Sequence, residues 1–166
     1  RQRAAGVLLR RLWQACWRLA HLPPPVIAAI NGYSLLGGGV LAFSSDLRIA
    51  VESATFMNPG AEYGVAVATH QMPYLVGDCA AREMILLGEP MTATDALACG
   101  LVNHVEPAAG ARAAAERLAQ AIAARGPLAV RYAKEAMLRG LDMPLDQALR
   151  YETDLTIILQ TTADRA

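Results

Sequence analysis

The first third of the chain alternates between a helical pattern and short apolar runs. Over residues 4–20, apolar side chains recur every three or four positions and arginines fall mainly between them, which predicts a helix with one buried face. Prolines end this helix, and the run 26–30 is apolar on both faces, which predicts a buried parallel strand. Further strands are expected over 46–50 and 54–57, and a short helix over 40–43.

The second half of the chain is helical in pattern. Short helices are predicted over 82–87 and 92–99, and the second begins with Thr92 and Asp95 at the spacing of a helix cap and stops at Gly100. Apolar residues at spacings of three and four predict longer helices over 112–125, 128–139 and 146–160. Helices that alternate with strands predict an α/β fold with crossover connections.

Composition excludes several classes of function. The chain has 166 residues, 54% of them hydrophobic, which suits one compact core. Its 15 basic and 15 acidic residues form no run of like charge, so a nucleic-acid partner is not expected. Its apolar runs fall short of the roughly 20 residues that span a bilayer, and arginines interrupt any signal peptide, so we expect a cytoplasmic protein without a membrane partner. The chain lacks an initiator Met, and we expect it to be part of a longer protein.

The cysteines give no sign of a metal site. Cys16, Cys79 and Cys99 are far apart, with no C-x-x-C pair and no histidine at ligand spacing. We therefore predict buried thiols and no metal.

Residues 31–39, N-G-Y-S-L-L-G-G-G, are the most informative stretch, because they follow a predicted strand and precede a helix. Glycines let the backbone approach a ligand and leave N–H groups at a helix N-terminus, where negative charge is stabilised. The spacing alone leaves two interpretations open, an anion-stabilising loop and a tight packing turn. A dinucleotide-binding loop and a P-loop are disfavoured because their glycine order and Lys-Ser/Thr pair are absent.

Four blocks of the sequence resemble the enoyl-CoA hydratase/isomerase (crotonase) superfamily, in family order: PPPVIAAINGYSLLGGGVLAFSSDLRIA, ATFMNP, YLVGDCAAREMILLGEPMTATDALACGLVNHV and GPLAVRYAKEAMLRG. The resemblance implies a spiral core of ββα units over 1–108, without the N-terminal part of that fold, and a helical C-terminal oligomerisation region over 109–166. It also implies a homotrimer or hexamer and an acyl-CoA thioester ligand. Coenzyme A would enter as part of the substrate, with no separate cofactor.

The resemblance also implies a binding site around the glycine run. Gly38, the middle glycine, would supply one backbone N–H of an oxyanion hole for the thioester enolate, and such a donor contributes about 3 kcal/mol to the transition state. Substrate-binding positions would be Gly37, Gly38, Leu41, Gly60 and Tyr63. The other N–H comes from an A-G-x-D type of loop in the family. This chain has no such loop, and we expect it in preceding residues of the parent protein.

Two departures from the family pattern affect the predicted chemistry. A hydratase has glutamates in the patterns GGGxE and F-G-x-P-E, and here these positions hold Leu41 and Gly60. Hydration needs a base to activate water and an acid to protonate carbon, each worth about 10²- to 10⁴-fold, and neither residue can act as one. The segment after Gly64 is also shorter than in the family, so one wall of the pocket is predicted to be rebuilt.

Other residues were considered as replacements for the missing acid and base. Glu62 is the candidate catalytic carboxylate, and the alternative is a solvated turn residue. His70 could titrate near neutral pH, although a lone histidine among apolar residues is more often simply hydrogen-bonded. Asp46 is interpreted as structural, and Ser34 is expected to bond local backbone. No nucleophile–histidine pair is recognisable.

Three functions are compatible with this pattern. The first is an acyl-CoA lyase or isomerase of fatty-acid type metabolism that uses the oxyanion hole without the hydratase pair, such as an isomerase, a decarboxylase or a thioester-cleaving variant. The second is a non-catalytic acyl-CoA binding protein, and the third is a structural subunit. An acid or base from Glu62 or His70 near Gly38 would favour the enzyme, whereas a pocket lined by Leu41 and apolar neighbours would favour the binder.

Overall fold

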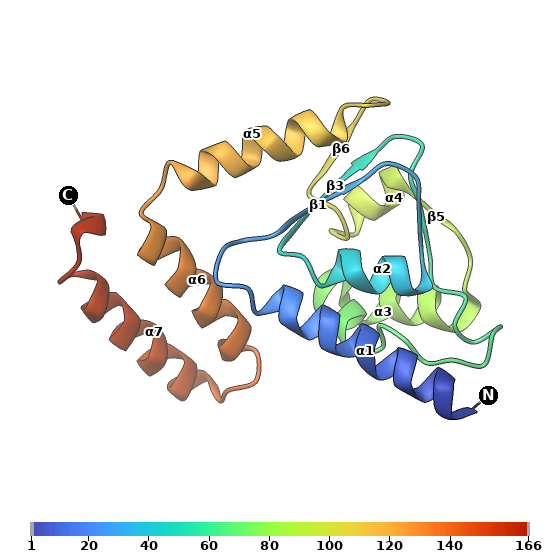
Figure 1. Ribbon diagram of the computed structural model, residues 1–166, viewed down its shortest axis with the longest axis horizontal. Helices are drawn as coiled ribbons and strands as arrows, with labels where there is room; N and C mark the ends of the chain where they lie inside the picture. The colour runs from blue at the N-terminus through green and yellow to red at the C-terminus, as the bar shows by residue number, and fades with distance from the viewer. Residues whose placement is uncertain (1, 166) are drawn as a thin grey trace. The chain divides into compact units, whose positions relative to one another are not determined.

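The computed structural model describes residues 2–165, with side chains over residues 6–164, and divides into two compact units (Figure 1). Unit 1 comprises Arg1–Ala20 and Val26–Glu116, and unit 2 comprises His21–Pro25 and Arg117–Ala166. The predicted oligomerisation role of residues 109–166 stays a prediction.

Unit 1 contains both sheets and the first helices. Its elements are α1 (Gln2–Ala20), β1 (Ile27–Ile30), β2 (Tyr33–Leu35), α2 (Leu36–Phe43), β3 (Leu47–Val51), β4 (Thr55–Met57), α3 (Gln71–Leu87), β5 (Met91–Thr92), α4 (Ala93–Ala98), β6 (His104–Glu106) and the start of α5 (Ala111–Ala123). Strands predicted over 26–30, 46–50 and 54–57 are confirmed as β1, β3 and β4. The sequence pattern missed β2, β5 and β6, because strands of two or three residues are too short to show a period.

The strands form two three-stranded sheets, in the orders β1-β3-β6 and β2-β4-β5. All pairings are parallel except that of β4 with β5. The succession β1-β2-α2 is repeated as β3-β4-α3, and each repeat adds one strand to each sheet. This repeat confirms the predicted ββα units, and α2 lies against both α1 and α3 (Figure 1).

The predicted extent of α3 was wrong. A helix was expected over 82–87, but α3 begins at Gln71 and includes a break at Gly77, where φ is 77° and ψ is 164°. Pro73 and Gly77 disturb the helical pattern in the sequence, and this hid the first turns.

The core of unit 1 is apolar around one buried cation. Phe56, Ile49 and Met72 are fully buried, and Arg48 is buried beside them on β3. The Arg48 Nε donates to the Leu101 carbonyl oxygen at 2.6 Å, and desolvation lowers the pKa of this guanidinium, partly offset by Asp46.

The prediction of buried thiols holds for Cys16 and is wrong for the other two cysteines. Cys79 is exposed on α3, and Cys99 at the end of α4 is half-buried. The exposure of each cysteine follows from the side of the helix on which the residue lies.

Unit 2 is helical. It contains α6 (Pro127–Gly140), α7 (Leu145–Leu159) and the 3₁₀ turn η1 (Ala163–Arg165), and these helices confirm the predictions over 128–139 and 146–160. The Tyr151 hydroxyl donates to Glu135 Oε1 at 2.7 Å and joins α7 to α6. This bond is the main reason that the pKa of Tyr151 is raised. None of the helices among the described residues is long and apolar enough to cross a membrane.

Candidate functional site

The candidate site begins where β2 turns into α2. Leu35 is extended, with φ −116° and ψ 144°, and stands at the N-cap without a side-chain hydrogen bond to the helix. The first N–H groups of a helix have no partner within it, and the peptide dipoles make this end positive. The first turn of α2 therefore offers backbone donors that the Leu35 side chain does not satisfy.

The three glycines of α2 have different surroundings. A Cβ on Gly39 would lie 3.2 Å from Phe43 Cε2 and 3.4 Å from the Ser34 carbonyl oxygen, so Gly39 allows close packing. A Cβ on Gly37 would make an ordinary contact with Leu12, and nothing lies within 4 Å of one on Gly38. Gly38 is exposed, so its backbone is the part of the run that a ligand can approach.

The two positions that the resemblance assigns to glutamate differ in structure. The Leu41 side chain lies on α2 and is 39% exposed. Gly60 is buried, and a Cβ there would lie 2.5 Å from the Val65 carbonyl oxygen. The cause is a tight turn in which the Val65 N–H donates to the Gly60 carbonyl oxygen at 2.8 Å. The backbone itself fills the space that a side chain at position 60 needs.

The segment after Gly60, which we call the wall segment (residues 60–71), is fastened at two points. The Asn58 amide donates through Nδ2 to the Val67 carbonyl oxygen at 2.9 Å. The Gln71 Nε2 donates to Ser44 Oγ at 2.8 Å, at the C-terminal end of α2. The first bond joins the wall segment to the residue after β4 and the second joins it to the end of α2, and the pattern in the sequence gave no signal for either.

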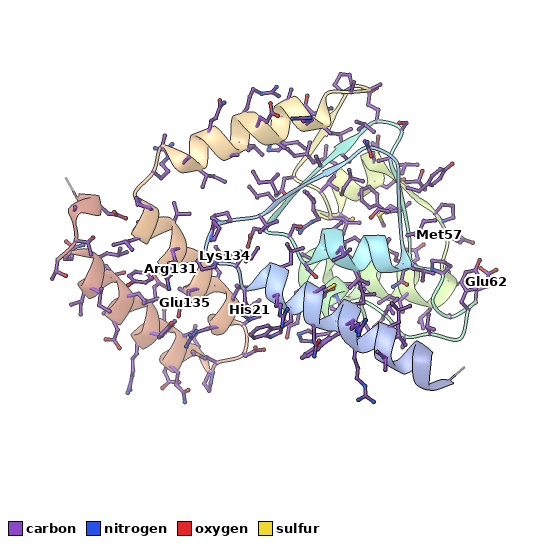
Figure 2. All side chains as sticks on the ribbon, in the orientation of Figure 1. His21, Met57, Glu62, Arg131, Lys134 and Glu135 are labelled. Atoms are coloured by element: carbon purple, nitrogen blue, oxygen red, sulfur yellow. The ribbon has the colours of Figure 1, made fainter. Side chains whose placement is uncertain are left out.

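The candidate acid and base residues lie on the surface of the wall segment. Glu62 and His70 are exposed, and Tyr63 is 65% exposed. Figure 2 shows Glu62 at the outer edge of unit 1. The His70 ring packs edge-on against Tyr74, with ring centroids 5.1 Å apart. These exposures agree with the solvated interpretation of Glu62, and the hydrogen bond from the wall segment to α2 is at Ser44 and not at Gly38.

The structure tests two further sequence interpretations. Asp46 Oδ2 accepts a hydrogen bond from the Val26 N–H at 2.6 Å, which confirms a structural role at the start of β1 and β3. The expectation that Ser34 bonds local backbone was wrong, because its buried Oγ has no hydrogen-bond partner in the described part of the chain. Ser34 is buried on β2, where it pairs with Phe56 of β4.

Among the described side chains, residues 6–164, no group of three or more His, Cys, Asp and Glu residues is placed so that it could hold a metal ion. Sequence reasoning also missed Arg48 as the residue that joins the chain near α2 to the loop after α4. A charged residue within the apolar run of β3 was the available signal.

Comparison with known proteins gives consistent results. The family model described as enoyl-CoA hydratase/isomerase matches residues 4–166. The protein YngF of Bacillus subtilis is 46% identical over 139 residues, which cover 81% of this chain and 53% of YngF. The short-chain-enoyl-CoA hydratase of Clostridium acetobutylicum is 35% identical over 155 residues, 92% of this chain and 58% of that protein. This chain spans less than two thirds of the length of either relative.

Solved structures show the same similarity. The crystal structure of an enoyl-CoA hydratase from Bacillus anthracis superposes with a TM-score of 0.96 at 34% identity, covering 99% of this chain and 65% of that one. DspI of Pseudomonas aeruginosa superposes with a TM-score of 0.94 at 32% identity, covering 99% and 64%.

Proposed function

The chain belongs to the enoyl-CoA hydratase/isomerase family and has its crotonase-like α/β fold, and from this premise we propose that it forms part of a site for an acyl-CoA thioester. The Gly38 N–H would donate to the thioester oxygen, with Gly37, Leu41, Gly60 and Tyr63 around the ligand. The observation that carries the proposal is the exposed Gly38 backbone in the first turn of α2, with open space beside its Cα. A donor in this place stabilises the negative charge that develops on the oxygen.

Ordinary hydration does not fit the side chains at this site. Leu41 has no proton to give or take, and Gly60 has no side chain. Because the Val65 carbonyl oxygen fills the space beside Gly60, a neighbouring carboxylate cannot enter at that position without a change in the turn. We propose a site that polarises a thioester without the glutamate pair.

Three thioester reactions differ in what they need beyond the oxyanion donor. Moving a double bond needs a base, and cleaving the thioester needs an activated water molecule. Loss of carbon dioxide from a carboxylate β to the thioester carbonyl needs neither. The carbon–carbon bond breaks, its electron pair forms the enolate, and water then supplies a proton to the α-carbon. For the first two reactions Glu62 is the proposed acid or base.

A non-catalytic acyl-CoA binding protein is the second candidate. The apolar side chain of Leu41, 39% exposed on α2, favours it, because such a surface holds an acyl group without reacting.

A homotrimer or hexamer is proposed for either function. The exposed apolar side chains of Met137, Leu141 and Leu145 in unit 2 support it, and light scattering after size-exclusion chromatography tests it.

Loss of the enoyl absorbance of crotonyl-CoA, measured with the full-length protein and a denatured control, separates these possibilities. We expect no hydration by folded protein together with measurable binding of butyryl-CoA in a calorimeter. Rapid hydration would contradict the proposal and make Glu62→Gln the first variant to test. For any isomerisation or thioester cleavage that is found, Glu62→Gln should lower turnover about 10²- to 10⁴-fold, and unchanged turnover would exclude Glu62.

Replacement of Gly38 by valine tests the proposed donor. We expect weaker thioester binding, since a β-branched side chain would occupy the space beside the N–H. Gly6→Val is the matched control, because Gly6 is also a helical glycine with nothing within 4 Å of a built Cβ. Equal affinity of the Gly38→Val and Gly6→Val proteins would show that the donor is elsewhere.

A further inference from the structure

The residue that turns the chain from β2 into α2 has a left-handed backbone. Leu36 has φ 41°, between the extended Leu35 and the helical Gly37. A leucine in this region is strained, because its Cβ approaches the following carbonyl oxygen. Such a residue persists only where the surrounding structure determines its conformation, and these residues cluster at functional sites.

This conformation has a consequence for the backbone donors. When a left-handed residue is followed by a right-handed one, successive backbone N–H groups turn toward one concave side and can bind an anion there. The parallel pairing of Leu35 with Met57 turns the Leu36 N–H toward β4, so the groups concerned in α2 are the N–H groups of Gly37 and Gly38. Their concave side would be the place of the thioester oxygen.

Leu36 differs from the other non-glycine residues with positive φ in the described part of the chain. These are Ala68, with φ 57°, and Ala109, with φ 67°, and both lie in loops. Only Leu36 adjoins the glycine run, where a glycine in its place would make the same turn without strain.

We propose that Leu36 is a positioning residue of the thioester site, which sets the direction of the first N–H groups of α2 through its left-handed backbone. This inference rests on the proposed function. The backbone conformation at position 36, and not the leucine side chain, is what the site requires. A residue that adopts positive φ easily should therefore preserve the hydrogen bonds to the ligand, and one that resists it should lose them.

The test measures the thioester carbonyl directly. Full-length protein is mixed with butyryl-CoA that carries ¹³C at the thioester carbonyl, and infrared difference spectra report the carbonyl band. Hydrogen bonds to the oxygen lower its frequency, so the wild-type band should lie below that of free butyryl-CoA. Leu36→Gly should keep this shift, and Leu36→Val should lose it, because a β-branched residue strongly resists positive φ.

Ala109→Val is the matched control. It imposes the same backbone penalty in an exposed loop before α5, so it should lower stability in a similar way and leave the carbonyl band shifted. A merely structural effect of Leu36→Val would act through stability, and the control would then change the band as well.

The possible results separate this inference from the function on which it rests. Wild-type protein that binds no butyryl-CoA contradicts the proposed function. Wild-type protein that binds it with an unshifted band overturns the donor geometry. A shift retained in Leu36→Val or lost in Leu36→Gly overturns the role of Leu36 alone. Should Leu36→Val fail to fold by circular dichroism, the Leu36→Gly result decides.

Discussion

Leu41 and Gly60 stand at the two positions where the resemblance to the family implies glutamate, and their surroundings differ. The Leu41 side chain is 39% exposed on a helix, and a longer polar side chain has room there. Gly60 is buried in a turn in which any Cβ would lie 2.5 Å from the Val65 carbonyl oxygen. At position 41 only the side chain departs from the family pattern, whereas at position 60 the backbone of the turn leaves no room for a side chain. A substitution should therefore introduce a glutamate at position 41 more easily than at position 60.

Gly60→Glu should have the largest effect. The Cβ must displace the Val65 carbonyl oxygen, and overpacking of this kind costs about 3 kcal/mol, so urea unfolding should show a clearly lower midpoint. Gly60→Ala should lower the urea midpoint nearly as much as Gly60→Glu, because the clash with the Val65 carbonyl oxygen is already made by the Cβ. Gly32→Glu is the control, since nothing lies within 4 Å of a Cβ at Gly32. Wild-type stability of Gly60→Glu would show that the turn opens easily.

The comparison of these two positions also shows which features of the site can be predicted from the sequence. The resemblance to the family implied that Leu41 and Gly60 replace carboxylates, because that prediction needs only residue identities at matched positions. It could not predict that a carbonyl oxygen fills the space beside Gly60, since this depends on how residues 60–65 close their turn. Apolar runs located β1, β3 and β4 for a similar reason, because the apolar character of a short run is read directly from residue identity.

Arg48→Met should have the next largest effect, and it tests whether the α2 side of the site depends on the core. The Arg48 guanidinium donates to the Leu101 and Ser45 carbonyl oxygens, and its loss would leave two buried acceptors unpaired. Buried hydrogen bonds to a charged group suggest a loss of about 2 to 3 kcal/mol in unfolding free energy.

The exposed Arg82 supplies the control for Arg48. It pairs with Asp78 at 2.6 Å, but both side chains are mostly in solvent, so Arg82→Met should leave the urea midpoint near that of wild type. Equal midpoints for Arg48→Met and Arg82→Met would mean that the hydrogen bonds of Arg48 do not stabilise the end of α2.

Leu41→Glu should have the smallest effect on stability and is the sharpest test of the difference between the two positions. Glutamate forms helices nearly as well as leucine, and the side chain at 41 is partly exposed, so the free energy of unfolding should change by about 0.5 kcal/mol or less. The variant should still not hydrate crotonyl-CoA, because hydration needs a second carboxylate that Gly60 cannot supply. If Leu41→Glu alone does hydrate crotonyl-CoA, another residue already serves as the partner. The double variant Leu41→Glu with Glu62→Gln then decides whether that partner is Glu62, since loss of the gained activity would identify it and retained activity would exclude it.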